Sequence, residues 1–405
     1  MFFSGLKNNQ VFTSICKILL FPFAILFLIL IRILRPIILI RLGFFYIQRI
    51  GHFAFDLEMY LSEKQIKNDK NTFDIFFLSG DPCNSYLYDI CKQNVLCITG
   101  FSFIVKLNEF LPFSEVHQYK PAVIRTASRD INGILKNTPS QTNFNFPYRH
   151  QGHDLLRHLN IKEDMKFVCL TIRDSAYLKN EFPEKDFSYH DYRDTQIEDY
   201  SESINYLISQ NYFVFRMGKK VSKKLELDSE NFFDYANSSF RTDFLDIWLM
   251  SNCEFVITNG TGLDEICNIK RLPMCYVNYI PLLQFVSYNK KAICTPKTLY
   301  NHDDKTPMSL SDQILKGFIN EKDMQDKKPI IKDNDSKIIL GSVEEMVTKI
   351  KNDWRRTPEE EELQHNFWQI LKTWKHFTQY HFHDDFRNSG SISDVYLKTN
   401  KDWLI

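Results

Sequence analysis

The chain has 405 residues, 44% of them hydrophobic, and its 50 basic side chains balance its 50 acidic ones. This length can bury two ordinary hydrophobic cores, and the neutral charge argues against nucleic acid as a partner, because nucleic-acid binding needs a strongly basic face. The nine cysteines form no C-x-x-C pair, which argues against a zinc site and a disulfide framework and is typical of buried thiols in a reducing compartment.

The amino-terminal residues are strongly hydrophobic. Val11 to Ile31 would form roughly 30 Å of helix, interrupted only by Lys17, which is enough to cross a bilayer. Arginines follow this run and favour a cytoplasmic location for the rest of the chain. Two interpretations stay open, a spanning helix and a kinked segment in the membrane interface, and the competing interpretation is a buried core helix. We predict a membrane-associated segment over residues 1–43.

A first α/β domain is expected over residues 44–160. Alternating apolar strands and helices are predicted in it: strands at 44–49, 74–78 and 95–99, and helices at 53–64 and 83–92. His52 follows Gly51 at the end of the first predicted strand. Residues 137–153 are rich in Asn, Thr, Pro and Gln, so the connection between the domains is expected there.

A second α/β domain is expected over residues 161–350. Its predicted elements are strands at 166–172, 212–215, 255–258 and 274–277, and a helix at 243–252. Thr195, with Glu198 three residues later, has the pattern of a capping box and predicts another helix start. Strands that alternate with helices imply a parallel sheet with helices on both of its faces.

Several strands of this second domain end in residues suited to binding an anion. In parallel α/β sheets a ligand lies outside the carboxyl ends of the strands, where Arg173, Arg216 and the turn Gly260-Thr261-Gly262 are expected. A glycine turn before a helix can present free backbone amides, and guanidinium groups bind phosphate oxygens in pairs. These residues predict a diphosphate site, although Arg173 could instead pair with Asp174, and the turn could be only a tight turn.

The last part of the chain, residues 351–405, is expected to be a helical segment. The charged stretch 301–335 before it is expected to form an irregular surface excursion. Thr357 can cap a helix, Pro358 suits its first position, and four glutamates follow at the positive end of the helix dipole. One face of the predicted amphipathic helix is apolar: Leu363, Phe367, Ile370, Leu371, Trp374 and Phe377.

The motif His381-Phe382-His383-Asp384-Asp385 contains side chains of the kind that bind metals. An isolated pair of histidines beside acids is more often an ordinary surface sequence than a metal site. We therefore assign no metal.

Six segments together resemble a family of bacterial proteins described as glycosyltransferases of surface polysaccharide synthesis. They are RIGHFAFDLEMYL (49–61), FVCLTIRDSAYL (167–178), YRDTQIEDY (192–200), YFVFRMGKKV (212–221), DYANSSFRTDFLDIWLMSNCEFVITNGTGLDEI (234–266) and PMCYVNYIP (273–281). The resemblance covers roughly residues 45–285. It implies a GT-B-like fold, with two Rossmann-like domains facing a cleft, a nucleotide-diphosphate sugar as donor, and neither a cofactor nor a bound metal.

The chain is also distantly similar to fucosyltransferases that use a GDP-sugar. This likeness assigns Arg173 to the donor pyrophosphate, Asp246 to the nucleobase and Thr261 to a hydroxyl of the turn, while Gly262 stands where that group has a second serine. Asp246 is equally suited to a structural pair inside its helix.

Sugar transfer also needs a base that deprotonates the acceptor hydroxyl. His52 is the first candidate, because a histidine titrates in the useful range, and Asp174 and Asp194 are the alternatives. A structural role for His52 is as plausible. Arg193 is a candidate for binding the donor phosphates or an anionic acceptor.

The sequence thus predicts a membrane-associated, cytoplasm-facing glycosyltransferase that transfers sugar, with inversion, to a surface-glycan or lipid-linked acceptor. A dinucleotide-dependent oxidoreductase is disfavoured, because no G-x-G-x-x-G follows the first strand. A non-catalytic nucleotide-sensing or scaffold protein of a polysaccharide assembly is the remaining alternative.

Overall fold

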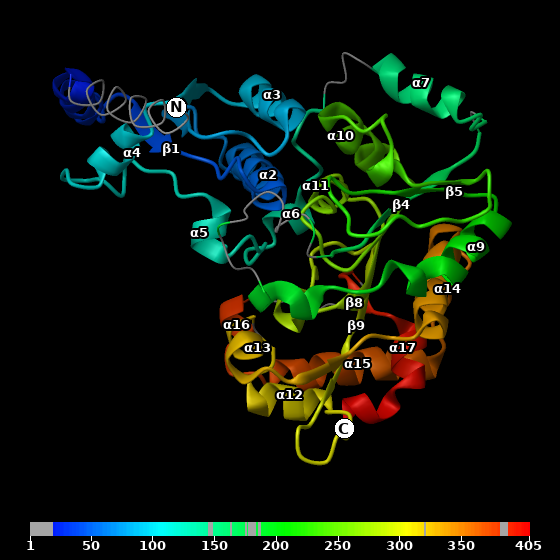
Figure 1. Cartoon of the computed structure of the whole chain (residues 1–405). Coiled ribbons are helices and arrows are strands. Elements are labelled where there is room, and N and C mark those ends of the chain that lie inside the picture. The colour runs from blue at the N-terminus through cyan, green and yellow to red at the C-terminus, as the bar shows by residue number, and fades with distance from the viewer. Residues whose placement is uncertain are drawn as a thin grey trace. The chain divides into compact units, whose positions relative to one another are not determined.

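The computed structural model describes residues 19–144, 149–162, 164–174, 176, 184, 188–319, 321–380 and 388–405. The chain forms two compact units, Met1–Ser128 and Arg129–Ile405 (Figure 1). This division falls earlier than the boundary near residue 160 that the sequence suggests. Arg271 accounts for part of the difference, because its side chain donates hydrogen bonds to the carbonyls of Leu135 (3.1 Å) and Thr138 (3.4 Å) and ties that stretch to the second unit.

In the first unit, three parallel strands form a sheet of order β1-β2-β3. The strands and the helices that connect them are β1 (Leu39–Gly43), α2 (Ile50–Lys67), β2 (Thr72–Leu78), α3 (Ser85–Asn94) and β3 (Cys97–Thr99). Arg41 and Asp74 form an ion pair of 2.7 Å between β1 and β2, and the Tyr60 hydroxyl donates to the same carboxylate at 3.0 Å. These partners compensate the buried charge of Asp74.

The first strand lies earlier in the chain than the sequence suggests. The prediction of a strand over Phe44–Arg49 is wrong, because these residues are irregular and α2 begins directly after them at Ile50. Strand β1 occupies Leu39–Gly43, inside the range assigned to the membrane-associated segment, and pairs with β2. A buried parallel strand and a lipid-facing helix are both continuous apolar runs, so hydrophobicity alone does not distinguish them.

Residues 19–33 form a helix with one buried face. Leu28 and Ile31 lie in a hydrophobic cluster with side chains of β1, β2 and α4 (Phe103–Asn108). Within the described part of the chain, no helix has both the length and the apolar character needed to cross a membrane. The run predicted from the sequence begins at Val11, outside the described residues.

The second unit is built on a parallel sheet of order β12-β9-β8-β7-β4-β5-β6. Its strands are β4 (Phe167–Thr171), β5 (Phe213–Arg216), β6 (Phe232–Phe233), β7 (Val256–Thr258), β8 (Met274–Tyr279), β9 (Ala292–Pro296) and β12 (Ser391–Ile392). From β4 the chain adds β5 and β6 on one side, then β7, β8 and β9 on the other. This reversal places a topological switch point between β4 and β7.

Helices cover both faces of this sheet (Figure 1). They are α7 (Arg149–His158), α9 (Ser201–Ser209), α10 (Asp243–Asn252), α11 (Glu265–Ile269) and α14 (Ser336–Ile350). Val168 and Leu170 of β4 point to one face, where they share a core with residues of α9 and α14. Phe167 points to the other face, as the alternation along a strand requires, and stacks on Trp248 of α10 with ring centroids 6.3 Å apart.

Helix α7 packs on α10 through a glycine. A Cβ atom built on Gly152 would lie 2.2 Å from the Trp248 ring, so no larger residue fits at this position without moving the indole. The close approach lets α7 lie directly against the α10 side of the sheet.

The stretch 301–335 is more regular than the sequence suggests. It contains α12 (Leu310–Lys316), α13 (Glu321–Lys327) and β11 (Ile330–Lys332), and β11 pairs antiparallel with β10 (Thr298–Tyr300). The prediction of an irregular excursion is therefore wrong. Ser309 caps α12 by accepting a hydrogen bond from the amide of Asp312 at 3.1 Å, a local signal that the high charge of the stretch obscures.

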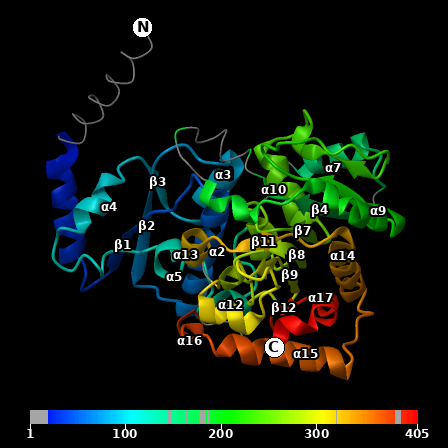
Figure 2. The same ribbon diagram turned by 60° about the horizontal axis from the view of Figure 1, so that its bottom comes forward.

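The carboxyl-terminal residues return to the sheet. Thr357 and Glu360 form a capping box at the start of α15 (Pro358–Lys372), and β12 pairs with β9 before the chain ends in α17 (Asp394–Thr399). Figure 2 shows α15 lying beside α17. The remaining short helices are α5 (Ala122–Thr126), α6 (Ile134–Asn137) and α16 (Phe377–Tyr380).

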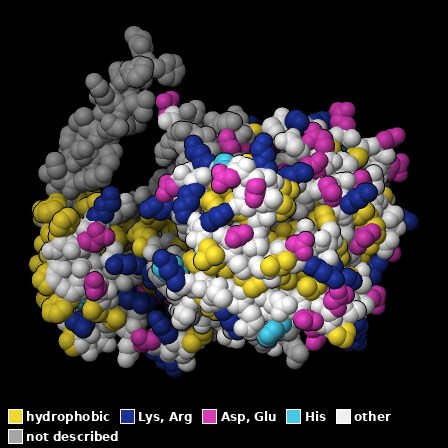
Figure 3. Space-filling view, turned by 90° about the horizontal axis from the view of Figure 1, so that it is seen from below, with side chains coloured by type: hydrophobic (Ala, Val, Ile, Leu, Met, Phe, Trp, Pro, Cys, Tyr) yellow, Lys and Arg dark blue, Asp and Glu magenta, His cyan; other side chains and the backbone are white. Residues whose placement is uncertain are grey.

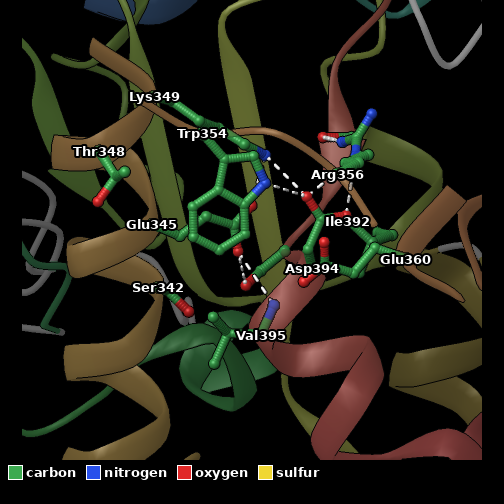
Figure 4. Close-up of polar contacts among 12 residues, drawn as sticks. Ser342, Glu345, Thr348, Lys349, Trp354, Arg356, Glu360, Ile392, Asp394 and Val395 are labelled. Carbon is green, nitrogen blue, oxygen red and sulfur yellow. Dashed lines mark hydrogen bonds and ion pairs between the residues drawn. The ribbon is translucent and has the colours of Figure 1, made fainter. Parts of the chain in front are cut away.

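A buried polar network holds this carboxyl-terminal part in place (Figure 4). The carboxylate of Asp394 is fully buried and accepts hydrogen bonds from Arg356 Nε at 2.9 Å, Trp354 Nε1 at 3.0 Å and Lys349 Nζ at 3.2 Å. Lys349 also pairs with the equally buried Glu345 at 2.5 Å. Because both carboxylates are removed from water, the network fixes one position of α17 against α14.

Candidate functional site at the switch point

The loops that follow β4 and β7 are joined at the switch point by one buried side chain. Asn259, directly after β7, accepts a hydrogen bond at Oδ1 from the amide of Arg173 (2.8 Å) and donates from Nδ2 to the carbonyl of Arg193 (2.9 Å). Its exposed fraction is 0%. Asn259 therefore sets the positions of two predicted site residues, Arg173 and Arg193. The position of Asn259 directly before the glycine turn is the sequence signal that marks it.

The loop of residues 192–195 is held over the same edge by buried side chains of later strands. Lys297, next to β9, donates hydrogen bonds to the carbonyls of Tyr192 (3.0 Å) and Asp194 (2.6 Å) and forms an ion pair with Asp333 at 2.8 Å. No local sequence pattern marks Lys297, because only the fold brings it to this loop.

Thr195 is part of this loop and does not cap a helix. Its hydroxyl accepts a hydrogen bond from Asn278 of β8 at 3.1 Å. The predicted capping box is therefore wrong, because Thr195 is bound to the sheet. A short 3-10 helix (Ile197–Tyr200) follows, and α9 begins at Ser201.

Charged and hydroxyl groups meet at this edge. Arg173 Nε lies 3.3 Å from Asp194 Oδ1, and the two side chains retain 16% and 23% of their exposure. Arg193 donates to the carbonyl of Gly260 at 2.7 Å, and the Thr261 hydroxyl donates to that of Thr171 at 3.1 Å. Five predicted site residues thus lie on one rim of the sheet: Arg173, Arg193, Asp194, Gly260 and Thr261.

The electrostatic balance at this rim is set by burial and by the arginine. Burial raises the pKa of Asp194 to about 6, while the guanidinium of Arg173 acts in the opposite direction. Near neutral pH, Asp194 is therefore the counter-ion of Arg173. An anionic ligand would have to compete with this carboxylate or share the arginine with it.

The glycine turn does not offer the free amides that the sequence predicts. The amide of Gly260 donates to Thr258 Oγ1 (3.0 Å), and the amide of Thr261 donates to the buried carboxylate of Asp264 (3.0 Å), which also accepts from the Thr258 hydroxyl (2.7 Å). The expected amide cradle is thus wrong for these two groups, because a carboxylate of the chain already satisfies the turn. The described contacts place cationic groups, rather than free turn amides, at this rim.

Burial raises the pKa of Asp264 to about 7, although the hydrogen bonds from Thr258 and Thr261 lower it. Gly260 beside it has a φ of +88°, and an added Cβ would lie 2.8 Å from the Tyr279 ring, so a glycine is required at this point of the turn. Gly262, the last residue of the turn, is exposed.

Two predicted donor contacts have structural partners instead. Arg216 is buried, pairs with Asp234 at 3.1 Å and donates to the carbonyl of Lys223 at 2.5 Å. Asp246 pairs with Arg241 at 2.6 Å, and burial raises its pKa to about 6. The prediction that Arg216 reaches a phosphate is therefore not supported by its contacts, and Asp246 takes the structural role that the sequence left open.

The carboxylate of Asp174 also has hydrogen-bond partners within the chain. Its Oδ2 accepts hydrogen bonds from the amide and hydroxyl of Ser222, at 2.8 and 3.0 Å, and its Oδ1 accepts from the amide of Ala176 at 2.9 Å. Asp174 thus joins the loops that follow β4 and β5. Its contacts favour a role in holding the rim together.

His52 lies in the first unit, in the first turn of α2 rather than at a strand end as predicted. Its Nδ1 is 2.9 Å from Ser128 Oγ. One helical turn later, Asp56 accepts a hydrogen bond from the amide of Val123 at 2.9 Å, and burial raises its pKa to about 7.

The structure offers no metal centre among the residues that it describes: no group of three His, Cys, Asp or Glu side chains is arranged to hold an ion there. The motif His381-Phe382-His383-Asp384-Asp385 lies outside the described residues.

No known protein family and no curated protein matches the sequence. The chain is similar to a family 9 glycosyl transferase from Veillonella parvula, with 11% identity over 77% of this chain and 98% of that one and a TM-score of 0.44. It is also similar to E. coli ADP-heptose LPS heptosyltransferase II, with 12% identity over 65% of this chain and 92% of that one and a TM-score of 0.37. A third similar structure is the iron-containing dodecameric glycosyltransferase TibC of enterotoxigenic E. coli, with 12% identity over 77% of this chain and 76% of that one and a TM-score of 0.37. Likenesses of this degree do not define the function of this chain.

Proposed function

We propose that this chain is a glycosyltransferase that moves a sugar from a nucleotide-diphosphate sugar to a hydroxyl of a surface-glycan or lipid-linked acceptor. One observation carries the proposal: Arg173 and Arg193 are fixed by the same buried side chain, Asn259, at the switch point of a doubly wound sheet. Crevices at such switch points are where open α/β sheets bind their ligands. Two guanidinium groups there suit a diphosphate, which is the leaving group of this reaction.

The roles of the rim residues follow from their contacts. Arg173 would stabilise the negative charge that develops on the leaving diphosphate. Its counter-ion Asp194, at 3.3 Å, would release the guanidinium so that it can bind the ligand. Arg193 is anchored through the carbonyl of Gly260, and the Thr261 hydroxyl supplies a further polar group. In the reaction the bond from the anomeric carbon to the phosphate oxygen breaks, the acceptor oxygen bonds to that carbon with inversion, and the acceptor proton passes to a base.

We assign the base to His52. Asp174 is held by Ser222 and Ala176, and an adjacent diphosphate would raise the pKa of Asp194 further above its value of about 6 and favour its protonated form. The contact of His52 Nδ1 with Ser128 Oγ would orient the imidazole. His52→Ala should then abolish transfer and retain donor binding. Unchanged transfer would remove His52 from the mechanism.

The proposal is tested with a panel of UDP, GDP, ADP and dTDP sugars. Thermal stabilisation by one nucleotide class identifies the donor, and release of its sugar to water or to an added acceptor shows turnover. Arg173→Ala should weaken donor binding about tenfold or more, while the exposed control Arg355→Ala should leave it unchanged. Stabilisation without any sugar release would favour the nucleotide-sensing alternative, and no response to any nucleotide sugar would overturn the proposal.

A further inference from the structure

The helix of residues 19–33 has a second apolar face, opposite the buried one. The buried face contains Ala24, Leu28 and Ile31, and the opposite face exposes Leu19 (67%), Phe23 (69%), Leu26 (64%), Leu30 (48%) and Ile33 (66%). A surface helix of a soluble domain normally carries polar residues on its outer face. Contiguous exposed apolar side chains of this kind mark an interaction site.

A second segment adds aromatic side chains beside the end of this helix. Phe110 and Phe113, which follow α4, are 83% and 65% exposed. Arg32 fastens their segment to the helix, because its Nε donates to the carbonyl of Pro112 and its Nη2 to Asn108 Oδ1, both at 2.8 Å. Figures 1 and 2 show α4 beside the helix. Hydrophobic side chains line this side of the first unit in Figure 3.

The charges around these residues are mainly basic. From Leu19 to Phe55 the sequence contains arginines and no Asp or Glu. The guanidinium of Arg35 lies 5.4 Å from the centre of the Phe113 ring. In the neighbouring turn the acids are Glu109 and Glu115, and Glu109 accepts a hydrogen bond from Gln118 at 3.1 Å. Apolar and aromatic side chains bordered by arginines fit the boundary between acyl chains and anionic headgroups.

We propose that this apolar surface, formed by Leu19, Phe23, Leu26, Leu30, Ile33, Phe110 and Phe113, docks onto a bilayer that contains anionic lipids. The helix would lie in the plane of the membrane, because its other face is committed to the core of the first unit. A symmetric second copy fits less well, because the residues from Leu19 to Phe55 contain no acid that could pair with the arginines of a partner copy. The inference stands whether or not the chain transfers sugar.

The test uses the full chain and vesicles of phosphatidylcholine with or without phosphatidylglycerol. Two double variants probe the two segments, Leu26→Ser/Leu30→Ser and Phe110→Ser/Phe113→Ser, and Leu315→Ser, an exposed residue (84%) of α12 in the second unit, is the matched control. Each double variant should weaken binding to anionic vesicles about tenfold, with the control unchanged. Binding that neither double variant alters, or that is equal on both vesicle types, would overturn the proposal.

A gain of signal provides an independent readout. Phe113→Trp should show more quenching by lipids brominated on their acyl chains than the wild-type chain does, because the new indole would enter the acyl boundary. No additional quenching would count against insertion. Sedimentation velocity supplies the remaining control: a dimer that Phe110→Ser/Phe113→Ser dissociates, with no vesicle binding by the wild type, would assign the surface to a second copy and overturn the proposal.

Discussion

The amide of Arg173 donates a hydrogen bond of 2.8 Å to Oδ1 of Asn259, and this bond spans the switch point between β4 and β7. The other end of the same side chain holds the carbonyl of Arg193 at 2.9 Å. Because Asn259 is fully buried, its geometry cannot relax toward water. The backbone positions that carry both guanidinium groups are therefore fixed before any ligand arrives, which is the preorganisation that electrostatic stabilisation of a leaving group requires.

Asn259→Ala tests this arrangement. The substitution leaves the Arg173 amide and the Arg193 carbonyl without their partner, so the free energy of unfolding should fall by about 1–3 kcal/mol. Affinity for the donor nucleotide should fall as well, because the two arginines lose their common anchor. Urea unfolding and nucleotide titration measure the two effects. The control is Asn252→Ala, because the exposed side chain of Asn252 donates a hydrogen bond to the carbonyl of Trp248 within the same helix, α10. A loss of stability with intact affinity would make Asn259 purely structural.

The ion pair of Arg173 and Asp194 predicts a pH dependence of donor binding. The folded pKa of Asp194 is about 6, and an adjacent diphosphate would raise it further, so binding takes up a proton and the affinity rises as the pH falls through that value. Calorimetric titration of wild type and Asp194→Asn over a series of pH values isolates this contribution. The variant should show a smaller change in affinity with pH, and identical profiles would refute the assignment of the carboxylate to the binding rim.

Asp264 predicts a pH dependence of stability. Its folded pKa of about 7 exceeds the ordinary value of 3.8, so the folded state holds this proton more tightly than the unfolded state. The resulting stability is complete below 3.8 and is lost as the pH rises through about 7. Asp264→Asn keeps an acceptor for Thr258 and Thr261 but does not titrate. The difference in unfolding free energy between wild type and variant should therefore change across this interval, and a constant difference would contradict the assignment.

The buried network around Asp394 predicts a large effect on stability. Asp394→Ala removes the common acceptor of Arg356, Trp354 and Lys349 and leaves cations buried without their partner, which should cost about 3–5 kcal/mol of unfolding free energy. Guanidinium-induced unfolding measures the loss. Asp402→Ala, an exposed acid near the chain end, should change stability by less than about 0.5 kcal/mol. Equal effects of the two substitutions would show that the buried network does not contribute the predicted unfolding free energy.

Many secondary-structure elements of the second unit can be predicted from the sequence. The central strands of its sheet are buried on both faces, so they are continuous apolar runs, and β4, β5, β7 and β8 lie where such runs predict them. Helix α10 spans Asp243–Asn252, the range that its apolar spacing predicts. The helix α15 begins at Pro358, behind the cap at Thr357, because that signal is local.

Other features depend on contacts that no local pattern encodes. Strand β1 directly follows the apolar amino-terminal run, so its composition does not distinguish it from the end of a membrane segment, and β12 is too short for any periodicity. Arg216 is the last residue of β5 and Arg173 lies just beyond the end of β4, but Arg216 forms an ion pair with Asp234 on the following segment. The partners of these charges decide their roles, and partners are set by tertiary structure.

The most direct measurement compares the affinities of the chain for a nucleoside diphosphate and the corresponding monophosphate. If Arg173 and Arg193 bind a diphosphate at the rim of β4 and β7, the wild-type chain should prefer the diphosphate by about tenfold or more, and Arg173→Ala should reduce that preference to about threefold or less. Arg355→Ala should retain the full preference. A preference that survives the loss of the Arg173 guanidinium unchanged would contradict the account.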